Sequence, residues 1–286
     1  MAREPSPTVS RRRLAAELRR LREDAQVTGT QVAQVLDGSS SKVSRMEKAQ
    51  VAAHREDVAR LADFYQVRPA VRDALLTLAA EAEGKGWWDA HNESLSESYT
   101  TFIGLEAGAE KALTWQNIVF PGLLQTPDYA RALIGFGDAW SPQPPTQIER
   151  LVRVRTRRGH ILEGPDPLSL SVLLEESVLM RRFGSPEVMR DQVRHVLRMA
   201  EQPNVSVRVV PLERSWVFHG FVLLKFPQCE GLDALHDDIV YIENARDAIF
   251  EENEQETFAY ERVFHRILAA ALSEEDSLKL IGEHAR

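Results

Sequence analysis

Two short stretches with the apolar spacing of helices, joined by a tight turn signal, constrain the fold of this chain most. Residues 28–36 carry three apolar side chains that would share one face of a helix: Val32, Ala33 and Leu36. Asp37-Gly38 is a turn signal, and the next segment, SSSKVSRMEKAQ, has Val43 and Met46 three residues apart. The sequence therefore predicts two helices that meet at a turn, with a small residue on the first letting them cross closely.

Three further helical patterns surround this pair. Apolar residues recur at helical spacing over residues 10–22, 54–65 and 69–82. Residues 1–9 contain two prolines and polar residues, and we expect them to form a disordered arm. The first half is therefore predicted to be an all-α bundle of five helices over residues 10–83.

The segment GKGWWD, residues 84–89, interrupts the helical patterns. Its two glycines resemble a phosphate-binding loop, but no strand pattern precedes them and no helix-opening glycine follows, so the context that such a loop needs is missing. We interpret the segment as a hinge whose two tryptophans pack on the next domain. The second domain is then expected over residues 84–286.

The second domain alternates between helical and strand patterns. Helices are predicted over six segments: residues 105–117, 127–135, 147–162, 185–202, 253–271 and 274–283. Strands are predicted in four: PLSLSVLLEES, NVSVRVVPL, FVLLKF and DIVYIE. The acidic run EENEQE, residues 251–256, suits the first turns of a helix, where the helix dipole favours negative charge. The expected class is mixed α/β, of the α+β type.

Charge is distributed unevenly along the chain. The net charge is −8, yet residues 1–60 hold 12 Lys/Arg against 8 Asp/Glu, a net of +4, and the remainder has a net of −12. A basic end on an acidic body can bind phosphate locally while the body repels non-specific DNA contact. The asymmetry is compatible with a nucleic-acid partner despite the negative total.

Composition excludes several classes of protein. No apolar run approaches the roughly 18 residues of a membrane-spanning helix, and the N-terminus is too arginine-rich for a signal peptide. A single cysteine, Cys229, excludes an intramolecular disulfide framework and a cysteine-rich zinc site. We therefore expect a cytoplasmic, nucleoid-associated protein with no membrane partner.

The sequence contains no familiar catalytic or metal-binding motif. A nucleophile elbow, a zinc-protease helix and a Walker loop are all missing from it. His219, His236, Asp237, Asp238 and Cys229 could be grouped as a metal cluster, but their spacing fits no ligand pattern. We expect no metal, no cofactor and no enzymatic activity.

The three serines after the turn suit a surface that binds DNA. In a helix-turn-helix the second helix enters the major groove with its N-terminal residues at the base edges. One serine would cap the helix, and the others would let the backbone come near DNA and offer hydroxyl groups. Arg45 is long enough to reach a guanine, and Lys42 points more plausibly at a phosphate. A capped hairpin inside an ordinary helical bundle has the same periodicity, so the residues alone leave both interpretations open.

The stretch TGTQVAQVLDGSSSKVSRMEKAQ resembles the helix-turn-helix of the Cro/repressor-type (Xre) family, over about residues 10–67. It departs from the family pattern at Asp37 and Ala49, where glycine is common, and Gly38 is expected to serve the turn one residue later. The resemblance implies contacts with bases or phosphates for a set of residues: Gly29, Thr30, Gln31, Ser39, Ser40, Ser41, Lys42, Ser44, Arg45 and Lys48.

The same resemblance implies that Glu47 turns inward and pairs with Arg22 on the first helix. Physical reasoning points the same way, because a glutamate beside Met46 is costly to bury unless it is paired. Removing one partner of a buried pair costs about 3–5 kcal/mol.

The second half, from about Gly86 to Glu283, resembles the C-terminal domain of WhiJ-like, antitoxin-like actinomycete transcriptional regulators. The segment PGLLQTPDYARAL carries this resemblance most specifically. It implies a small acidic protein, encoded nearby, as a partner. Candidate contacts with a partner or ligand are Gly122, Leu123, Gln125, Thr126, Tyr129, Arg131 and His219. Capping by Thr126 and core packing explain several of these residues without any ligand.

These observations predict a dimeric, sequence-specific transcriptional regulator that binds a palindromic double-stranded operator. A dimer is expected because one bundle buries too little surface for operator-level affinity. The C-terminal domain would dimerise and receive a signal from the acidic partner or from a ligand. Two alternatives stay open: an antitoxin-like protein that mainly binds its partner and uses DNA binding for autoregulation, and a regulator that senses a small molecule.

Overall fold

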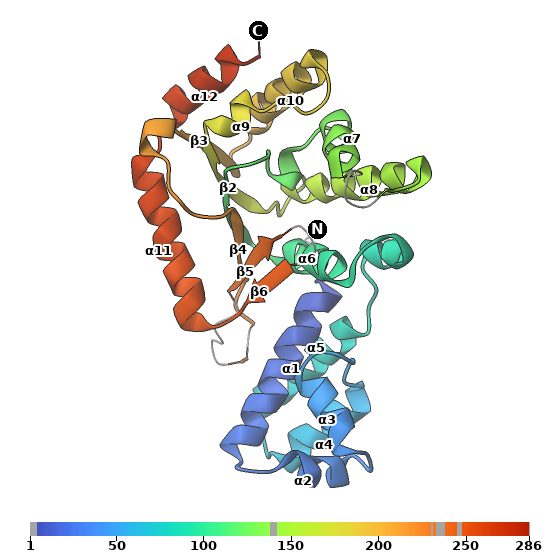
Figure 1. Ribbon diagram of the computed structural model, residues 1–286. Helices are drawn as coiled ribbons and strands as arrows, with labels where there is room; N and C mark the ends of the chain where they lie inside the picture. Colours follow the sequence, from blue (N-terminus) through green and yellow to red (C-terminus); the bar gives the residue numbers. More distant parts are fainter. Residues whose placement is uncertain (1–4, 138–141, 230, 233–237, 245–247, 286) are drawn as a thin grey trace. The chain divides into compact units, whose positions relative to one another are not determined.

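The chain forms two compact units (Figure 1). The computed structural model describes residues 5–137, 142–229, 231–232, 238–244 and 248–285. The helical unit runs to residue 90 and also contains the described residues of 227–232. The sheet unit contains the described residues of 91–226 and 238–285. The sequence patterns place the boundary at residue 84 and give no sign of the 227–232 segment.

The helical unit is an all-α bundle around one apolar core. Its helices in the described residues are α1 (Pro7–Asp24), α2 (Gly29–Val35), α3 (Ser40–Glu47), α4 (Arg55–Phe64) and α5 (Pro69–Ala82), followed by the short 3-10 helix η1 (Trp87–Ser94). The predicted inner faces lie in this core, where Val32, Val43 and Met46 are at most 2% exposed. The helical fold expected for this half, with a helix-turn-helix inside it, is confirmed.

Helix α1 begins earlier than the sequence predicts. Pro7 stands in its first turn, a position that proline favours. Val9 is buried, and Ser10 Oγ donates a hydrogen bond to Glu81 Oε2 at 2.6 Å. The disordered arm predicted over residues 1–9 therefore does not extend to residues 7–9, and residues 1–4 lie outside the described part of the chain.

Four helices of the bundle end in the same backbone motif at a residue other than glycine. After α1, α2, α3 and α4 the chain takes a left-handed φ at Gln26 (55°), Asp37 (49°), Ala49 (55°) and Gln66 (52°). Two amides then bond back to carbonyls of the last turn; after α3, the N–H of Ala49 donates to the Met46 oxygen at 3.0 Å and that of Gln50 to the Arg45 oxygen at 2.9 Å. These bonds offset a left-handed φ that costs about 1–2 kcal/mol in a residue with a Cβ.

The turn between α2 and α3 differs from the expectation. Asp37 takes the left-handed conformation, and Gly38 does not. The Asp37 carboxylate also pairs with Arg60 at 2.7 Å. The prediction that Gly38 would serve this turn is wrong, because aspartate visits the left-handed region more readily than most residues with a side chain.

An ion pair joins α1 to α3. Arg22 Nε lies 2.7 Å from Glu47 Oε1, the pair expected from the sequence. This hydrogen bond raises the pKa of Arg22. The two side chains are still 20% and 11% exposed, so the 3–5 kcal/mol expected for a fully buried pair is too large here.

The described residues of 227–232 complete the core of the helical unit. Cys229 and Leu232 pack against it, and Arg13 donates a hydrogen bond to the carbonyl oxygen of Pro227. Gly231 has a φ of 85°, and a Cβ there would come within 3.0 Å of the Ala70 oxygen on α5. A glycine therefore lets this segment lie against the helix.

The sheet unit is built on one mixed sheet. Its strands are β1 (Lys111–Gln116), β2 (Ser169–Glu175), β3 (Val205–Val210), β4 (Phe221–Lys225), β5 (Ile239–Glu243) and β6 (Ala248–Glu251). They lie in the order β3-β2-β1-β4-β5-β6. Strands β1, β2 and β3 are parallel, whereas β4, β5 and β6 continue from β1 in antiparallel pairs. The α+β class predicted for this half is confirmed.

Helices cover both faces of this sheet. They are α6 (Glu97–Gly108), α7 (Pro127–Phe136), α8 (Pro145–Arg158), α9 (Ser177–Met180), α10 (Pro186–Met199), α11 (Glu254–Ala270) and α12 (Glu274–Glu283), with the 3-10 turns η2 (Gly122–Leu124), η4 (Gly159–Leu162) and η5 (Leu212–Arg214). Figure 1 shows α11 along one face, and α6, α7 and α8 on the opposite side.

The register of β1 separates these two faces. Leu113 and Trp115 share a buried core with Phe264 of α11. Because side chains alternate along a strand, Thr114 points to the opposite face, where its register partner on β4 is Val222. This second face forms the floor of a cavity described below.

Two strands differ from the sequence prediction. β1 lies within residues 105–117, where a helix was predicted. The four central residues of β1 are buried, so it lacks the polar–apolar alternation that reveals a strand. β6 takes Glu251, which was predicted to begin a helix; α11 instead starts at Glu254 with Asn253 as its N-cap.

We expect Ala49→Gly to raise the free energy of unfolding of the chain by about 0.5–1 kcal/mol, measured by urea denaturation. Glycine removes the cost of the left-handed φ but loses more entropy on folding, so the net gain is smaller than the strain. Gly38→Ala is the matched control, because a Cβ there would lie 3.5 Å from Lys42 Cδ, an ordinary contact. A loss of stability in Ala49→Gly, or a large loss in Gly38→Ala, would contradict this account of the turns.

We expect Arg22→Ala to lower the free energy of unfolding by about 1–2 kcal/mol, because it leaves the partly buried Glu47 without its charged donor. Glu47→Ala should lower the free energy of unfolding by a similar amount, and the double variant should lower it little more than either single variant. A double-mutant cycle measures the resulting coupling energy between the two side chains. Arg19→Ala, on the same helix but with a side chain 62% exposed, should leave the melting temperature unchanged. Full retention of stability in Arg22→Ala would show that the pair contributes nothing.

Candidate nucleic-acid interface

Side-chain caps define where α2 and α3 begin. Thr28 and Gln31 form a reciprocal capping box at α2: the Gln31 N–H donates to Thr28 Oγ1 at 3.3 Å, and the Thr28 N–H donates to Gln31 Oε1 at 2.8 Å. Ser39 caps α3 by accepting from the Lys42 N–H at 3.2 Å. The first of the three serines is therefore structural, and Ser40 and Ser41 form the first turn of the helix.

Helix α3 has one buried face and one exposed polar face. Val43 and Met46 point into the bundle. The predicted DNA contacts that are exposed to solvent are Thr30, Gln31, Ser39, Ser40, Ser41, Ser44, Arg45 and Lys48. Within the described part of the chain, Arg45 and Lys48 have no ion-pair partner. The first turns of α2 and α3 contain no acidic residue, so no carboxylate there opposes an approaching phosphate.

The structure brings several of the predicted contacts together. Gly29 at the start of α2, Ser40 and Ser44 of α3, and Lys48 just after α3 line one depression, together with Arg19 of α1 and the Arg22–Glu47 ion pair. Backbone and hydroxyl donors beside two cations are the groups that proteins use to hold DNA phosphates. Arg45 lies outside this depression.

Lys42 differs from the other predicted contacts. Its Nζ lies 2.6 Å from Asp57 Oδ2 at the start of α4, and the two side chains are 36% and 14% exposed. This ion pair competes with the phosphate contact proposed for Lys42 from the sequence. Lys42 therefore adds less to the basic surface than the sequence suggests.

The candidate contacts of the sheet unit fall into two groups. Gly122, Leu123, Gln125 and His219 line a cavity of about 840 Å³ on the sheet face opposite α11. The others do not line it, and each has a structural role: Thr126 caps α7, Tyr129 on α7 is fully buried, and Arg131 pairs at the surface with Asp128 and Glu149.

Tyr129 is a core residue rather than a ligand contact. Burial raises its pKa to about 12, and its hydroxyl accepts a hydrogen bond from the Phe120 N–H at 3.4 Å. The Thr126 N–H donates to Gln192 Oε1 at 2.8 Å, and Gln192 Nε2 donates to the Leu124 oxygen at 2.7 Å. This buried network explains the pattern around Thr126 by folding alone.

Sequence reasoning missed the charged residues of the cavity. Arg155 and Arg158 of α8, Glu106 of α6 and Glu243 of β5 all line it. The arginines stand in the run RLVRVRTRR, where helical spacing does not tell a buried arginine from an exposed one. Glu106 lies in a segment whose apolar residues suggested only a core helix.

Two negative findings concern the described residues. None of the helices there combines the length and the apolar character that a bilayer crossing requires. No group of three or more His, Cys, Asp or Glu side chains in the described part of the chain is arranged to hold a metal ion. The metal cluster considered from the sequence includes His236 and Asp237, which lie outside the described residues.

Two domain families match the chain, whereas no curated protein and no solved structure does. A family described as a helix-turn-helix domain matches residues 13–75, which contain α2 and α3. Such a domain indicates a DNA-binding regulator. The family described as Domain of unknown function (DUF5753) matches residues 99–283, more than half of the chain. The chain therefore belongs to the DUF5753 family and carries a helix-turn-helix domain ahead of that domain.

Proposed function

We propose that the protein is a sequence-specific transcriptional regulator that reads DNA with α3. The observation that carries the proposal is the two-sided character of this helix inside a matched helix-turn-helix domain. Its apolar residues are buried, while Ser40, Ser41, Ser44 and Arg45 face solvent. In this arrangement the serines at the helix N-terminus meet base edges and phosphates, and the guanidinium of Arg45 reaches a guanine.

The proposal includes a dimer on a palindromic operator and membership of the Xre group of regulators. Support for the dimer is energetic, because one recognition helix makes too few contacts for operator-level affinity. Support for the Xre assignment comes from the SKVSRME segment and from the Arg22–Glu47 pair, which has the partners that the resemblance implies.

A small acidic protein is the partner that we propose for the sheet unit, as the resemblance to WhiJ-like, antitoxin-like regulators implies. Support comes from α8, which presents Arg150, Arg153 and Arg157 at exposed positions three and four residues apart, hence along one side of the helix. Such a basic row complements an acidic surface. In the antitoxin-like alternative, this contact is the main role and DNA binding serves autoregulation. No catalytic role is part of the proposal, since the sequence lacks the motifs that would carry one.

We expect Arg45→Ala to lose about 1–3 kcal/mol of discrimination between the operator and a duplex with the contacted guanine replaced. The measurement is fluorescence anisotropy with the DNA upstream of the chain's own gene, over a salt series. The salt slope should stay nearly unchanged, because a base contact releases no counterions. Arg68→Ala is the matched control: Arg68 is an exposed arginine of the same unit that lies between α4 and α5.

Two outcomes would count against this assignment. A uniform weakening across sequences, with a slope shallower by about one, would make Arg45 a phosphate contact. Failure of the wild-type protein to prefer its upstream DNA over an unrelated duplex would remove the regulator proposal and leave the partner-binding alternative.

We expect Asp57→Asn to strengthen DNA binding at low salt and to steepen the salt slope by about 0.9, because Lys42 then becomes free to meet a phosphate. The same titration checks this prediction. Asp63→Asn, which removes the partner of Arg72 at the surface of α4, is the control and should change neither quantity. An unchanged slope in Asp57→Asn would place Lys42 away from the DNA.

A further inference from the structure

The cavity of the sheet unit has the size and the walls of a small-molecule site. Its volume of about 840 Å³ lies within the range of ligand pockets, roughly 300–1,000 Å³. Its floor is a row of register partners across three strands: Thr114 of β1, Val222 of β4 and Tyr241 of β5. All of the residues that line it belong to the sheet unit.

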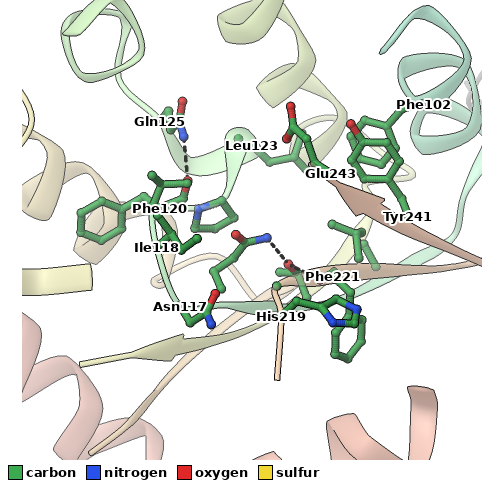
Figure 2. A pocket seen from close by; sticks show the side chains of 18 of the residues that line it. Phe102, Asn117, Ile118, Phe120, Leu123, Gln125, His219, Phe221, Tyr241 and Glu243 are labelled. Carbon is green, nitrogen blue, oxygen red and sulfur yellow. Dashed lines mark hydrogen bonds between the residues drawn. The ribbon is translucent and has the colours of Figure 1, made fainter. Parts of the chain in front are cut away.

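An aromatic pair and an aliphatic side chain stand on opposite sides of this space. Phe102 of α6 stacks on Tyr241 with ring centroids 3.8 Å apart and planes 16° apart. Figure 2 shows this pair on one side of the cavity and Ile118, whose side chain is exposed, on the other. The ring of Phe120 beside it is buried against Tyr129. Two apolar walls that face each other across a gap suit a flat, apolar ligand body.

One of the two cavity arginines is already neutralised. Arg158 donates from Nε and Nη2 to the two carboxylate oxygens of Glu106, both at 2.8 Å, and from Nη1 to the Tyr99 hydroxyl at 2.7 Å. Both charged side chains are about 5% exposed or less. This pair is a closed structural unit and needs no ligand.

The second arginine, Arg155, is not neutralised. No carboxylate of the described residues lies within ion-pair distance of it, and its Nε is buried without a hydrogen-bond partner among them. Nη1 donates to Gln125 Oε1 at 3.3 Å, and Gln125 is itself anchored to the Phe120 oxygen at 2.7 Å. A buried polar group left unsatisfied is destabilising. A carboxylate that accepts hydrogen bonds from this guanidinium would remove that penalty.

The carboxylate of Glu243, which also lines the cavity, does not need a ligand to satisfy it. Glu243, at the end of β5, is exposed to solvent, so water satisfies its carboxylate. The group that a ligand has to match is therefore a cation beside apolar walls.

We propose that this cavity binds an aromatic monocarboxylic acid, with its ring system between the Phe102–Tyr241 pair and Ile118 and its carboxylate on Arg155. A guanidinium binds a planar carboxylate through two parallel hydrogen bonds, which gives both charge and orientation. The Arg158–Glu106 pair acts as a positioning element, because it holds α8, and therefore Arg155, against α6.

The cavity also has a covalent path to the DNA-binding unit. Strands β4 and β5, which contribute Val222 and Tyr241 to the floor, are joined by a segment from which Cys229 and Leu232 pack against the core of the helical unit. A ligand that shifts these strands changes the anchoring of that segment. We therefore expect occupancy to change operator affinity, a consequence that rests on the proposed function.

The test uses the full-length protein without DNA. Isothermal titration measures the binding of phenylacetate, indole-3-acetate and 1-pyreneacetate, each compared with the carboxamide and the amine of the same skeleton. At least one acid should bind, with an affinity at least tenfold above that of its carboxamide, since charge-assisted hydrogen bonds contribute about 1.5–3 kcal/mol. Arg155→Met should abolish this preference, and Arg155→Lys should retain part of it.

Controls separate the site from the fold. Arg153→Met, an exposed arginine on the same helix, should bind the acid like wild type. Circular dichroism and the melting temperature establish that each variant is folded. If no acid binds, if acid and carboxamide bind equally, or if the amine binds best and depends on Glu243, the proposal is overturned.

A second arm addresses regulation. Operator affinity is measured with and without the acid that binds, and a change of about fivefold or more is expected. Ligand binding without such a change overturns the coupling. Because the ligand titration contains no DNA, failure of the site and failure of DNA binding by α3 are separate results.

Discussion

A single buried cation organises the sheet unit. Arg158 is 5% exposed, and taking a guanidinium out of water costs several kcal/mol unless its donors are met. Burial alone would lower the pKa of Arg158, but Glu106 and Tyr99 raise it well above its usual value. These partners come from α6, and Gly122 of η2 lies so close that a Cβ would be 3.3 Å from the guanidinium. One ion pair thus fixes two helices and a turn around the cavity, and it places Arg155, one turn earlier on α8, at the cavity wall.

In the helical unit, the main structural constraint is that several helices must end abruptly within a small bundle. The unit ends them with left-handed residues that carry side chains, and the hydrogen bonds of the motif offset the backbone strain. The turn at Asp37 matters most for function. It ends α2, and after Gly38 the Ser39 cap starts α3, so that Val43 and Met46 enter the core while the serines stay outside. The orientation of the exposed face therefore follows from the turn and the cap together.

Local patterns predicted the helical unit well, and non-local contacts explain most of what they missed. The inner faces of α2 and α3 repeat at helical spacing, and Glu47 beside Met46 called for a partner, so both were accessible from the sequence. Strand β1 was not, because its central residues are covered on both faces and show no alternation. The cavity was not predictable either. The role of each arginine depends on a partner that is distant in the sequence. Arg155 contacts Gln125, about 30 residues away, and Arg158 contacts Glu106, about 50 residues away. Only the tertiary structure brings these partners near.

The helical unit is not formed by the first part of the sequence alone, because residues of the 227–232 segment contribute to it. Cys229 and Leu232 belong to the core of a bundle whose other members lie before residue 91. Bringing this segment back to a bundle that otherwise ends at residue 90 closes a long loop of the chain. Closing such a loop costs conformational entropy, although the cost grows only slowly with the length of the loop. The apolar contacts of these residues and the close approach of Gly231 to α5 offset that cost. A division of the chain at residue 84 therefore does not separate the two units, because part of the helical unit is encoded between two strands of the sheet.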